Sequence, residues 1–350
     1  MASKLRATSI NVAELAGVSQ SAVSRVFTPG ASVSMQTRAK VLAAAAKLKY
    51  RPNAIARTLI TNKSRLIGVV TPFLDNPFYS DVLQKLSGRL QEHAFQVLLF
   101  TGFRNKESEK LLARVLQYDV DGLIFASTTL SSAFATECDA AGVPVVLFNR
   151  TTRRDEVSSV TSNNLRGGRH VADFLLAGGH KCFAYVAGIT TSSTNRDRES
   201  AFVKRLRSAG HELSHRVEAN YSYTEALDAA RTVFGSANPP DAVFCANDQM
   251  AMAVMEVARN EFGLHVPKDV SIVGYDDIKP AGWPSFDLTT VEQPVACMIE
   301  TTVEFVLKRI MSEVVEPLHR VFDGDLIVRG SARIPKRGVV ESGGRRIWDP

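Results

Sequence analysis

Two different hydrophobic periodicities divide this chain. Near the N-terminus, apolar residues recur three or four positions apart, which predicts short amphipathic helices. Thr8 can cap a first helix that Gly17 ends, and Ser19 can cap a second helix that runs to about Phe27. A third helix is expected to begin near Ser34. These caps and lengths predict a compact, three-helix head.

The first two helices have the spacing of a helix-turn-helix. Ala13 allows the helices to approach closely, Gly17 tolerates a left-handed turn, and Val23 fills the wedge between them. We expect the third helix to complete the core with Val41, Leu42, Ala45 and Leu48. The outer face of the second helix is then short and polar, which suits base edges and phosphates in a major groove, with candidate DNA contacts at Ser19, Gln20, Ser21, Ser24 and Arg25. A generic helical hairpin is the alternative.

Beyond residue 65 the pattern changes to short apolar runs that alternate with helical segments. Runs at 66–70, 96–100, 122–126 and 143–148 predict buried strands, and the alternation restarts after about residue 165. Repeated strand–helix units predict parallel, doubly wound sheets with helices on both faces. The chain is therefore expected to join a small all-α head to an α/β body of two halves.

The composition agrees with a globular protein of two or three domains. The chain has 350 residues, of which 45% are hydrophobic and 22% charged. It contains no run of about 18 apolar residues and no apolar segment of a secretion signal near its start, so neither a membrane helix nor export is expected. The four cysteines are scattered and are expected to be reduced thiols of a cytoplasmic protein.

The charge is concentrated in the head. Residues 1–65 hold eleven Lys and Arg residues and one acid, Glu14, which gives a net charge of +10. The whole chain carries +6, so the remainder carries −4. A basic head on a mildly acidic body is typical of a nucleic-acid-binding module. Charge alone would also fit a solvated basic arm.

Several separated motifs resemble the lactose-repressor (LacI) family of bacterial transcription regulators. They are VAELAGVSQSAVSRVF, then VSMQTRAKVLAAAAKLKYRPNAIARTL and SRLIGVV, and the similarity continues to about Arg333. The resemblance implies a homodimer that binds double-stranded, palindromic operator DNA and is expected to repress transcription. It also implies a body like a periplasmic binding protein, with two lobes, three crossovers and a small-molecule effector in the cleft.

The resemblance predicts the domain boundaries. Residues 1–51 would form the DNA-binding head and 52–64 a hinge helix and linker. The effector-binding and dimerisation body would span 65–333, with lobe 1 at about 65–161 and 292–321 and lobe 2 at about 162–291 and 322–333. Residues 334–350 would be a polar tail.

The linker carries a second set of expected DNA contacts. Pro52 prevents continuation of the third helix, and Asn53 can cap a new one that is too short to be stable alone. By resemblance, this hinge helix orders on the operator, where Leu59 wedges into the minor groove. The expected contacts are Asn53, Ala56, Arg57 and Leu59. Packing of Leu59 on the body is the alternative.

Polar and aromatic residues follow the predicted strands, where ligands of doubly wound folds bind. Arg, Asp and Asn can make paired hydrogen bonds to hydroxyls or carboxylates, and aromatic rings can cover sugar faces. The candidate effector contacts are Phe73, Asn76, Phe78, Asn149, Arg150, Asn163, Arg198, Tyr221, Asn247 and Asp276. By resemblance, Arg198, Asn247 and Asp276 match effector-contacting positions. Each residue could instead be a loop cap, and Asp248 is the strongest such case.

Three departures from the family pattern bear on the ligand. The chain has Asn149 where members often have Asp, Ser162-Asn163 where many have Asp-Asn, and Ala201 where Gly is usual. Because Arg150 and Arg198 remain, the pocket is expected to favour a neutral or anionic polyol, such as a sugar or sugar acid.

One motif points elsewhere. His211 to His215 reads H-E-L-S-H, a zinc-protease pattern, but it follows a helix-ending signal and is expected to be a decoy. The chain lacks a G-x-S-x-G elbow, a Walker A loop and G-x-G-x-x-G, so no enzymatic activity or cofactor is expected. A sugar-transport receptor and an enzyme on a doubly wound fold remain the rival function classes.

Overall fold

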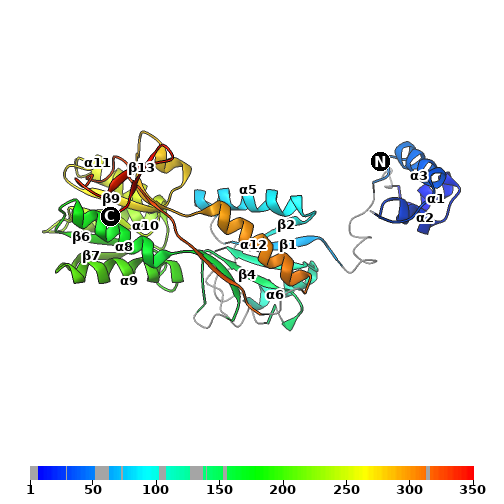
Figure 1. Cartoon of the computed structure of the whole chain (residues 1–350), viewed down its shortest axis with the longest axis horizontal. Coiled ribbons are helices and arrows are strands. Elements are labelled where there is room, and N and C mark those ends of the chain that lie inside the picture. The colour runs from blue at the N-terminus through cyan, green and yellow to red at the C-terminus, as the bar shows by residue number, and fades with distance from the viewer. Residues whose placement is uncertain are drawn as a thin grey trace. The chain divides into compact units, whose positions relative to one another are not determined.

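A computed structural model describes residues 7–28, 30–51, 63–71, 74–101, 108–126, 137–138, 140–152, 156–312 and 316–350. The chain divides into two compact units, Met1–Ser64 and Arg65–Pro350, each described by itself (Figure 1). No helix in these ranges is long and apolar enough to cross a membrane.

The head is built from α1 (Ser9–Ala16), α2 (Gln20–Val26) and α3 (Met35–Lys47). The predicted caps Thr8 and Ser19 and the predicted helix start at Ser34 are confirmed: all three side chains accept backbone hydrogen bonds at helix starts. Gly17 ends α1 in the left-handed region, at φ 63°. The small core consists of Val12, Ala13, Val23, Val26, Val41, Ala44 and Ala45.

One predicted core residue of the head is wrong. Leu42 is 47% exposed, because the face of α3 that packs on α1 and α2 carries Val41, Ala44 and Ala45. Leu42 follows Val41 by one position and so points about 100° away around the helix. Leu48 packs at the edge of the core as expected.

The first lobe of the body has a parallel sheet in the order β11-β5-β4-β3-β1-β2. Helices α5 and α12 contact each other beside this sheet (Figure 1). The elements are β1 (Leu66–Val70), α5 (Pro77–Glu92), β2 (Gln96–Phe100), α6 (Ser108–Gln117), β3 (Gly122–Ala126), β4 (Val145–Phe148), β5 (Ser158–Ser162), α12 (Val295–Ile310) and β11 (His319–Phe322).

The second lobe has a mixed sheet in the order β13-β14-β12-β10-β9-β8-β6-β7. It is parallel from β10 to β7, and antiparallel pairs join β12, β14 and β13. The elements are α8 (Asn164–Ala177), β6 (Phe183–Ala187), α9 (Ser193–Ser208), β7 (Leu213–Glu218), α10 (Tyr223–Phe234), β8 (Ala242–Cys245), α11 (Asp248–Asn260), β9 (Ser271–Asp276), the 3-10 helix η1 (Lys279–Gly282), β10 (Thr289–Glu292), β12 (Leu326–Ile327), β13 (Val339–Ser342) and β14 (Arg345–Trp348).

Three segments carry the chain between the lobes. The first follows β5 at Ser162, the second runs from Glu292 at the end of β10 to α12, and the third joins β11 to β12. Side chains connect them: Ser162 Oγ donates to Gln293 Oε1 at 3.1 Å, and Asn163 Nδ2 donates to Asp323 Oδ1 at 2.8 Å. The lobes are therefore joined by crossovers that are bonded to one another.

The predicted polar tail is wrong. Residues 339–348 form the β13–β14 hairpin, which pairs with β12 and extends the second sheet. Trp348 is 5% exposed and packs edge-on against Phe174 of α8, with ring centroids 5.5 Å apart. A buried aromatic ring and a strand ladder make this segment part of the folded body.

Candidate functional site

Eight polar and aromatic side chains from both lobes surround a small cavity in the body. Lobe 1 contributes Asn76, Tyr79 and Asn149, and lobe 2 contributes Thr194, Arg198, Tyr221, Asn247 and Asp276. The free volume is about 10 Å³, room for about one water molecule. The predicted site thus brings six of its residues together, and a larger ligand requires the lobes to separate.

A wider groove adjoins this cavity. It has a volume of about 800 Å³ and lies between α5, the segment 276–283 and the start of α12. Asp276 lines both the cavity and the groove, and Phe78 lines the groove. The two spaces share Asp276, and we refer to the cavity as the polar inner end and to the groove as the mixed outer end of the cleft.

Arg198 is the best-anchored residue of the inner end. Its side chain is 2% exposed; Nε donates to Asn164 Oδ1 at 2.8 Å and Nη1 to the Ala246 carbonyl at 2.5 Å. The guanidinium also lies 3.5 Å from the Tyr275 ring centroid. Burial disfavours its charge, but the nearby carboxylate of Asp276, 3.6 Å away, keeps the pKa of Arg198 above its usual value.

Two glycines in α8 make this placement possible. A side chain at Gly168 would come within 2.3 Å of the Arg198 carbonyl, and one at Gly167 within 2.5 Å of the Tyr275 hydroxyl. Close packing of α8 on α9 therefore depends on these two positions, and it fixes where the Arg198 side chain begins.

Asp276 ends β9 and faces Arg198. Burial raises the pKa of Asp276 to about 6, although Arg198 and a 2.6 Å hydrogen bond from Gln293 Nε2 both oppose the rise. Its neighbour Asp248 is fully buried and bonds to the Ile278 amide and the Thr290 hydroxyl. Burial and the charge of Asp276 raise the pKa of Asp248 well above its usual range.

Three cavity-lining residues hold a strained backbone. Asn149, Tyr221 and Asp276 have φ of 57°, 61° and 120°, values that non-glycine residues rarely adopt. Such strain persists where surrounding contacts enforce it, and it clusters at functional sites. The Tyr221 ring covers Gly188, and its hydroxyl lies 3.0 Å from Thr194 Oγ1.

Three buried polar atoms in the lining have no hydrogen-bond partner among the described residues. They are Asn149 Oδ1, Arg198 Nη2 and Asn247 Nδ2. Asn247 also caps α11, because its Oδ1 accepts a hydrogen bond from the Met250 amide. Its Nδ2 takes no part in this cap and is available to a ligand. Asn76 likewise caps α5 through the Phe78 amide. Buried groups of this kind normally find partners, so the inner end is chemically suited to a hydroxylated ligand.

The remaining predicted contacts lie elsewhere. Asn163 lines neither space: it caps α8 and bonds to Asp323 at the crossovers, and its neighbour Asn164 holds Arg198 instead. Arg150 also lies outside both linings, and burial lowers its pKa to about 10. Phe73 falls outside the described residues. Asp248 does not cap α11, because Asn247 does.

Sequence reasoning missed Tyr79 and Thr194. Tyr79 follows Phe78 on α5, and its hydroxyl accepts a 3.4 Å hydrogen bond from Asn149 Nδ2, while Thr194 lies in the first turn of α9. Tyr79 lies one position after the predicted Phe78, and Thr194 lies four positions before the predicted Arg198 on the same helix.

The head presents its predicted contacts on one surface. Ser19, Gln20, Ser21, Ser24 and Arg25 are all exposed. Ser19 Oγ accepts from the Ala22 amide, and Gln20 Nε2 donates to Ser9 Oγ at 3.0 Å. The predicted hinge contacts Asn53, Ala56, Arg57 and Leu59 lie outside the described residues.

The H-E-L-S-H motif is not a helix. His211 precedes β7 and packs against the Phe183 ring, while His215 lies within the strand. A zinc-protease pair needs both histidines one helical turn apart, and this geometry does not provide that.

Comparisons with known proteins agree with both units. Residues 10–53 match the family model "Bacterial regulatory proteins, lacI family", and 172–332 match "Periplasmic binding protein-like domain". The HTH-type transcriptional regulator CelR of Thermobifida fusca is 33% identical over 95% of this chain and 100% of its own length. Catabolite control protein A of Priestia megaterium is 30% identical over 89% of this chain and 95% of its own length.

Solved structures give the same result. The lac repressor dimer bound to operator and the anti-inducer ONPF has a TM-score of 0.84 at 29% identity, covering 93% of this chain and 98% of that one. A CelR–cellobiose complex has a TM-score of 0.72 at 31% identity, covering 93% and 100%.

Proposed function

Because the chain belongs to the lacI family of bacterial regulatory proteins, we propose that it is a repressor that binds a palindromic operator as a homodimer. A small polar effector in the interlobe cleft would control that binding. One head reads only a few base pairs, and two heads related by twofold symmetry supply the remaining specificity. The protein would act in the cytoplasm, at the nucleoid.

The set of unpartnered atoms in the cleft carries the effector proposal. Asn149 on lobe 1 faces a cavity whose other side holds Arg198 and Asn247 on lobe 2. A hydroxyl group donates and accepts, so one polyol can satisfy groups on both lobes at once. A ligand that bonds to both lobes binds one lobe arrangement better than another, which is the requirement for a switch.

The charges in the lining favour a neutral sugar over a sugar acid. The inner end holds one cation, Arg198, and one carboxylate, Asp276, 3.6 Å apart. A carboxylate on the ligand would meet Arg198 but would also be repelled by Asp276, and Arg150 does not line the cavity. The ring of Tyr221 offers an apolar surface for a sugar face.

Thermal unfolding in the presence of sugars tests the effector proposal. We expect glucose or cellobiose, or another neutral sugar of a panel, to raise the midpoint in a concentration-dependent way, because a ligand of the native state stabilises it. Stabilisation by gluconate or other sugar acids alone would support the anionic alternative. Stabilisation by no sugar would contradict a polyol effector.

In the head and hinge, Arg25→Ala and Leu59→Ala are expected to impair DNA binding differently. Loss of Arg25 removes polar groove or phosphate contacts and should weaken operator binding by about 1–3 kcal/mol. Loss of Leu59 removes the proposed minor-groove wedge, so its variant should bend the operator less while the protein stays folded. Fluorescence anisotropy and gel-shift bending assays measure both, with the exposed Lys47→Ala as a control of equal charge. A Leu59→Ala protein that bends the operator normally would rule out the wedge.

We propose that the dimer interface lies on the body, where lobe helices such as α5 (Pro77–Glu92) and α12 (Val295–Ile310) offer the dimer face. These two helices contact each other beside the first sheet. Residues 339–348 form an antiparallel hairpin and not a heptad helix. Sedimentation of a monomer at micromolar concentration that persists on operator would contradict the dimer.

A further inference from the structure

The C-terminal hairpin brings an arginine to the second crossover. The turn Gly343-Gly344, with φ of 56° and 75°, places Arg345 at the start of β14. Arg345 Nη1 lies 2.6 Å from Glu292 Oε2 and 3.7 Å from Asp277 Oδ2. One guanidinium therefore reaches two carboxylates on separate segments.

Those carboxylates mark the ends of two neighbouring strands. Glu292 is the last residue of β10 and is the register partner of Asp276, the last residue of β9. Asp277 follows directly and is also held by Arg329 at 2.7 Å. Arg345 thus connects the ends of β9 and β10 through two carboxylates that line the groove.

The chain neighbours of these two carboxylates, Asp276 and Gln293, are hydrogen-bonded to each other beside the cavity. Asp276 lines the cavity, and Gln293, the first residue of the crossover, donates to it at 2.6 Å. Gln293 also accepts from Ser162 at the first crossover. The ion pairs of Arg345 at the groove and the Asp276–Gln293 hydrogen bond beside the cavity therefore hold the same two strand ends.

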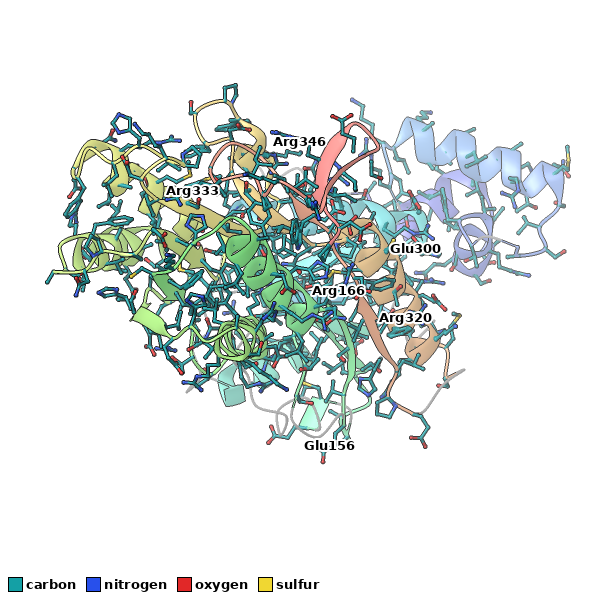
Figure 2. All side chains as sticks on the ribbon, turned by 60° about the vertical axis from the view of Figure 1, so that its left-hand side comes forward. Glu156, Arg166, Glu300, Arg320, Arg333 and Arg346 are labelled. Atoms are coloured by element: carbon teal, nitrogen blue, oxygen red, sulfur yellow. The ribbon has the colours of Figure 1, made fainter. Side chains whose placement is uncertain are left out.

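The hairpin is fixed well enough to hold Arg345 in place. β14 pairs with β12, and the buried Trp348 packs against Phe174 of α8. Arg346, which follows Arg345 in the chain, is exposed on the surface (Figure 2). Successive strand residues point to opposite faces, so the two arginines differ in direction although they are adjacent.

We propose that Arg345 is a positioning residue of the effector cleft. Arg345 fixes the position of Asp276 and the direction of the chain after β10, where it crosses to lobe 1. The description of this space as an effector cleft rests on the proposed function, but the ion pairs of Arg345 with Glu292 and Asp277 do not depend on it.

Amide hydrogen exchange of the full chain, without DNA or sugar, tests this. The Glu292 amide donates to the Asp325 carbonyl at 2.8 Å and the Gln293 amide to the Asp276 carbonyl at 3.4 Å, so both amides report on these strand ends. Arg345→Ala should speed their exchange about 2–5-fold, the range for a partly exposed ion pair. Arg345→Lys should restore part of the protection, and Glu292→Gln should reproduce the loss from the other side.

Arg346→Ala is the matched control and should exchange like the wild type. Amides of β6 (Phe183–Ala187) should be unaffected in every variant. Unchanged exchange at Glu292 and Gln293 in Arg345→Ala, an equal rise in β6, or the same rise in Arg346→Ala would each overturn the proposal. Because no DNA or ligand is used, this result is independent of whether the protein proves to be a sugar-controlled repressor.

Discussion

Arg198→Ala should lower the free energy of unfolding by about 3–5 kcal/mol, the usual cost of removing one partner from a buried ion pair. The variant leaves Asp276 buried without its cation and leaves Asn164 Oδ1 and the Ala246 carbonyl without their donor. It also removes the guanidinium that packs on the Tyr275 ring. Urea unfolding followed by circular dichroism measures the loss.

Arg196→Ala provides the matched comparison. Arg196 lies on the same helix, but its side chain is 48% exposed and pairs only with the neighbouring Asp197 among described residues. Its removal should change the unfolding free energy by less than about 0.5 kcal/mol. Equal, small losses in the two variants would show that Arg198 does not hold the inner end of the cleft together.

Asp276→Asn should become more stable relative to the wild type as the pH rises from 4 to 7. Burial raises the folded-state pKa of Asp276 to about 6, above its ordinary value of 3.8. A raised pKa means that the carboxyl stabilises the fold while protonated, and that this stability is lost as the pH rises through 6. At about 1.4 kcal/mol per pH unit between the two pKa values, the difference between the proteins should grow by about 2 kcal/mol from pH 4 to 7.

Asp269→Asn tests the sign of this effect. The His265 amide donates to Asp269 at 2.8 Å and lowers the pKa of Asp269. Its contribution is therefore present at neutral pH and lost as the pH falls through that pKa, opposite to Asp276. Unfolding measured at each pH from 2 to 7 decides the point, because the contribution of Asp269 is lost only as the pH falls below 3.8, whereas that of Asp276 is lost mainly above 3.8. A pH-independent difference between Asp276→Asn and the wild type would contradict the assignment.

The sequence predicted the head well because its determinants are local. Thr8, Gly17, Ser19 and Ser34 act within one helical turn of their own positions, and the structure uses each as a cap or a stop. The strands with continuous apolar runs, such as β1 and β3, were predicted equally well. In these helices and strands, the local sequence preferences and the burial pattern predict the same secondary structure.

The strands that escaped prediction are polar. β5 reads SSVTS yet is fully buried, because Ser158 and Ser159 bond to the Leu318 amide and the His319 ring on β11. β13 and β14 are rich in charge, and their pairing depends on Trp348 reaching Phe174 far away in the chain. No local pattern contains these long-range partners.

The same limit applies to the site. Position after a strand identified Asn149, Asn247 and Asp276, and the family resemblance identified Arg198; all four meet in one cavity. It could not separate Asn163 from Asn164, because which amide faces Arg198 depends on where α8 begins. Local sequence predicts which end of a sheet carries the site, and packing decides which side chains line it.

Recovery of operators from the native genome with the purified full-length chain tests the central claim most directly. Bound fragments should share one pseudo-palindrome, with a twofold-symmetric footprint and one dimer per site. A neutral sugar that stabilises the protein should change operator affinity by about 5–150-fold. Asp276→Asn should retain operator binding and lose that response. Enrichment of no common sequence, or an operator affinity that a bound sugar leaves unchanged, would contradict an effector-controlled repressor.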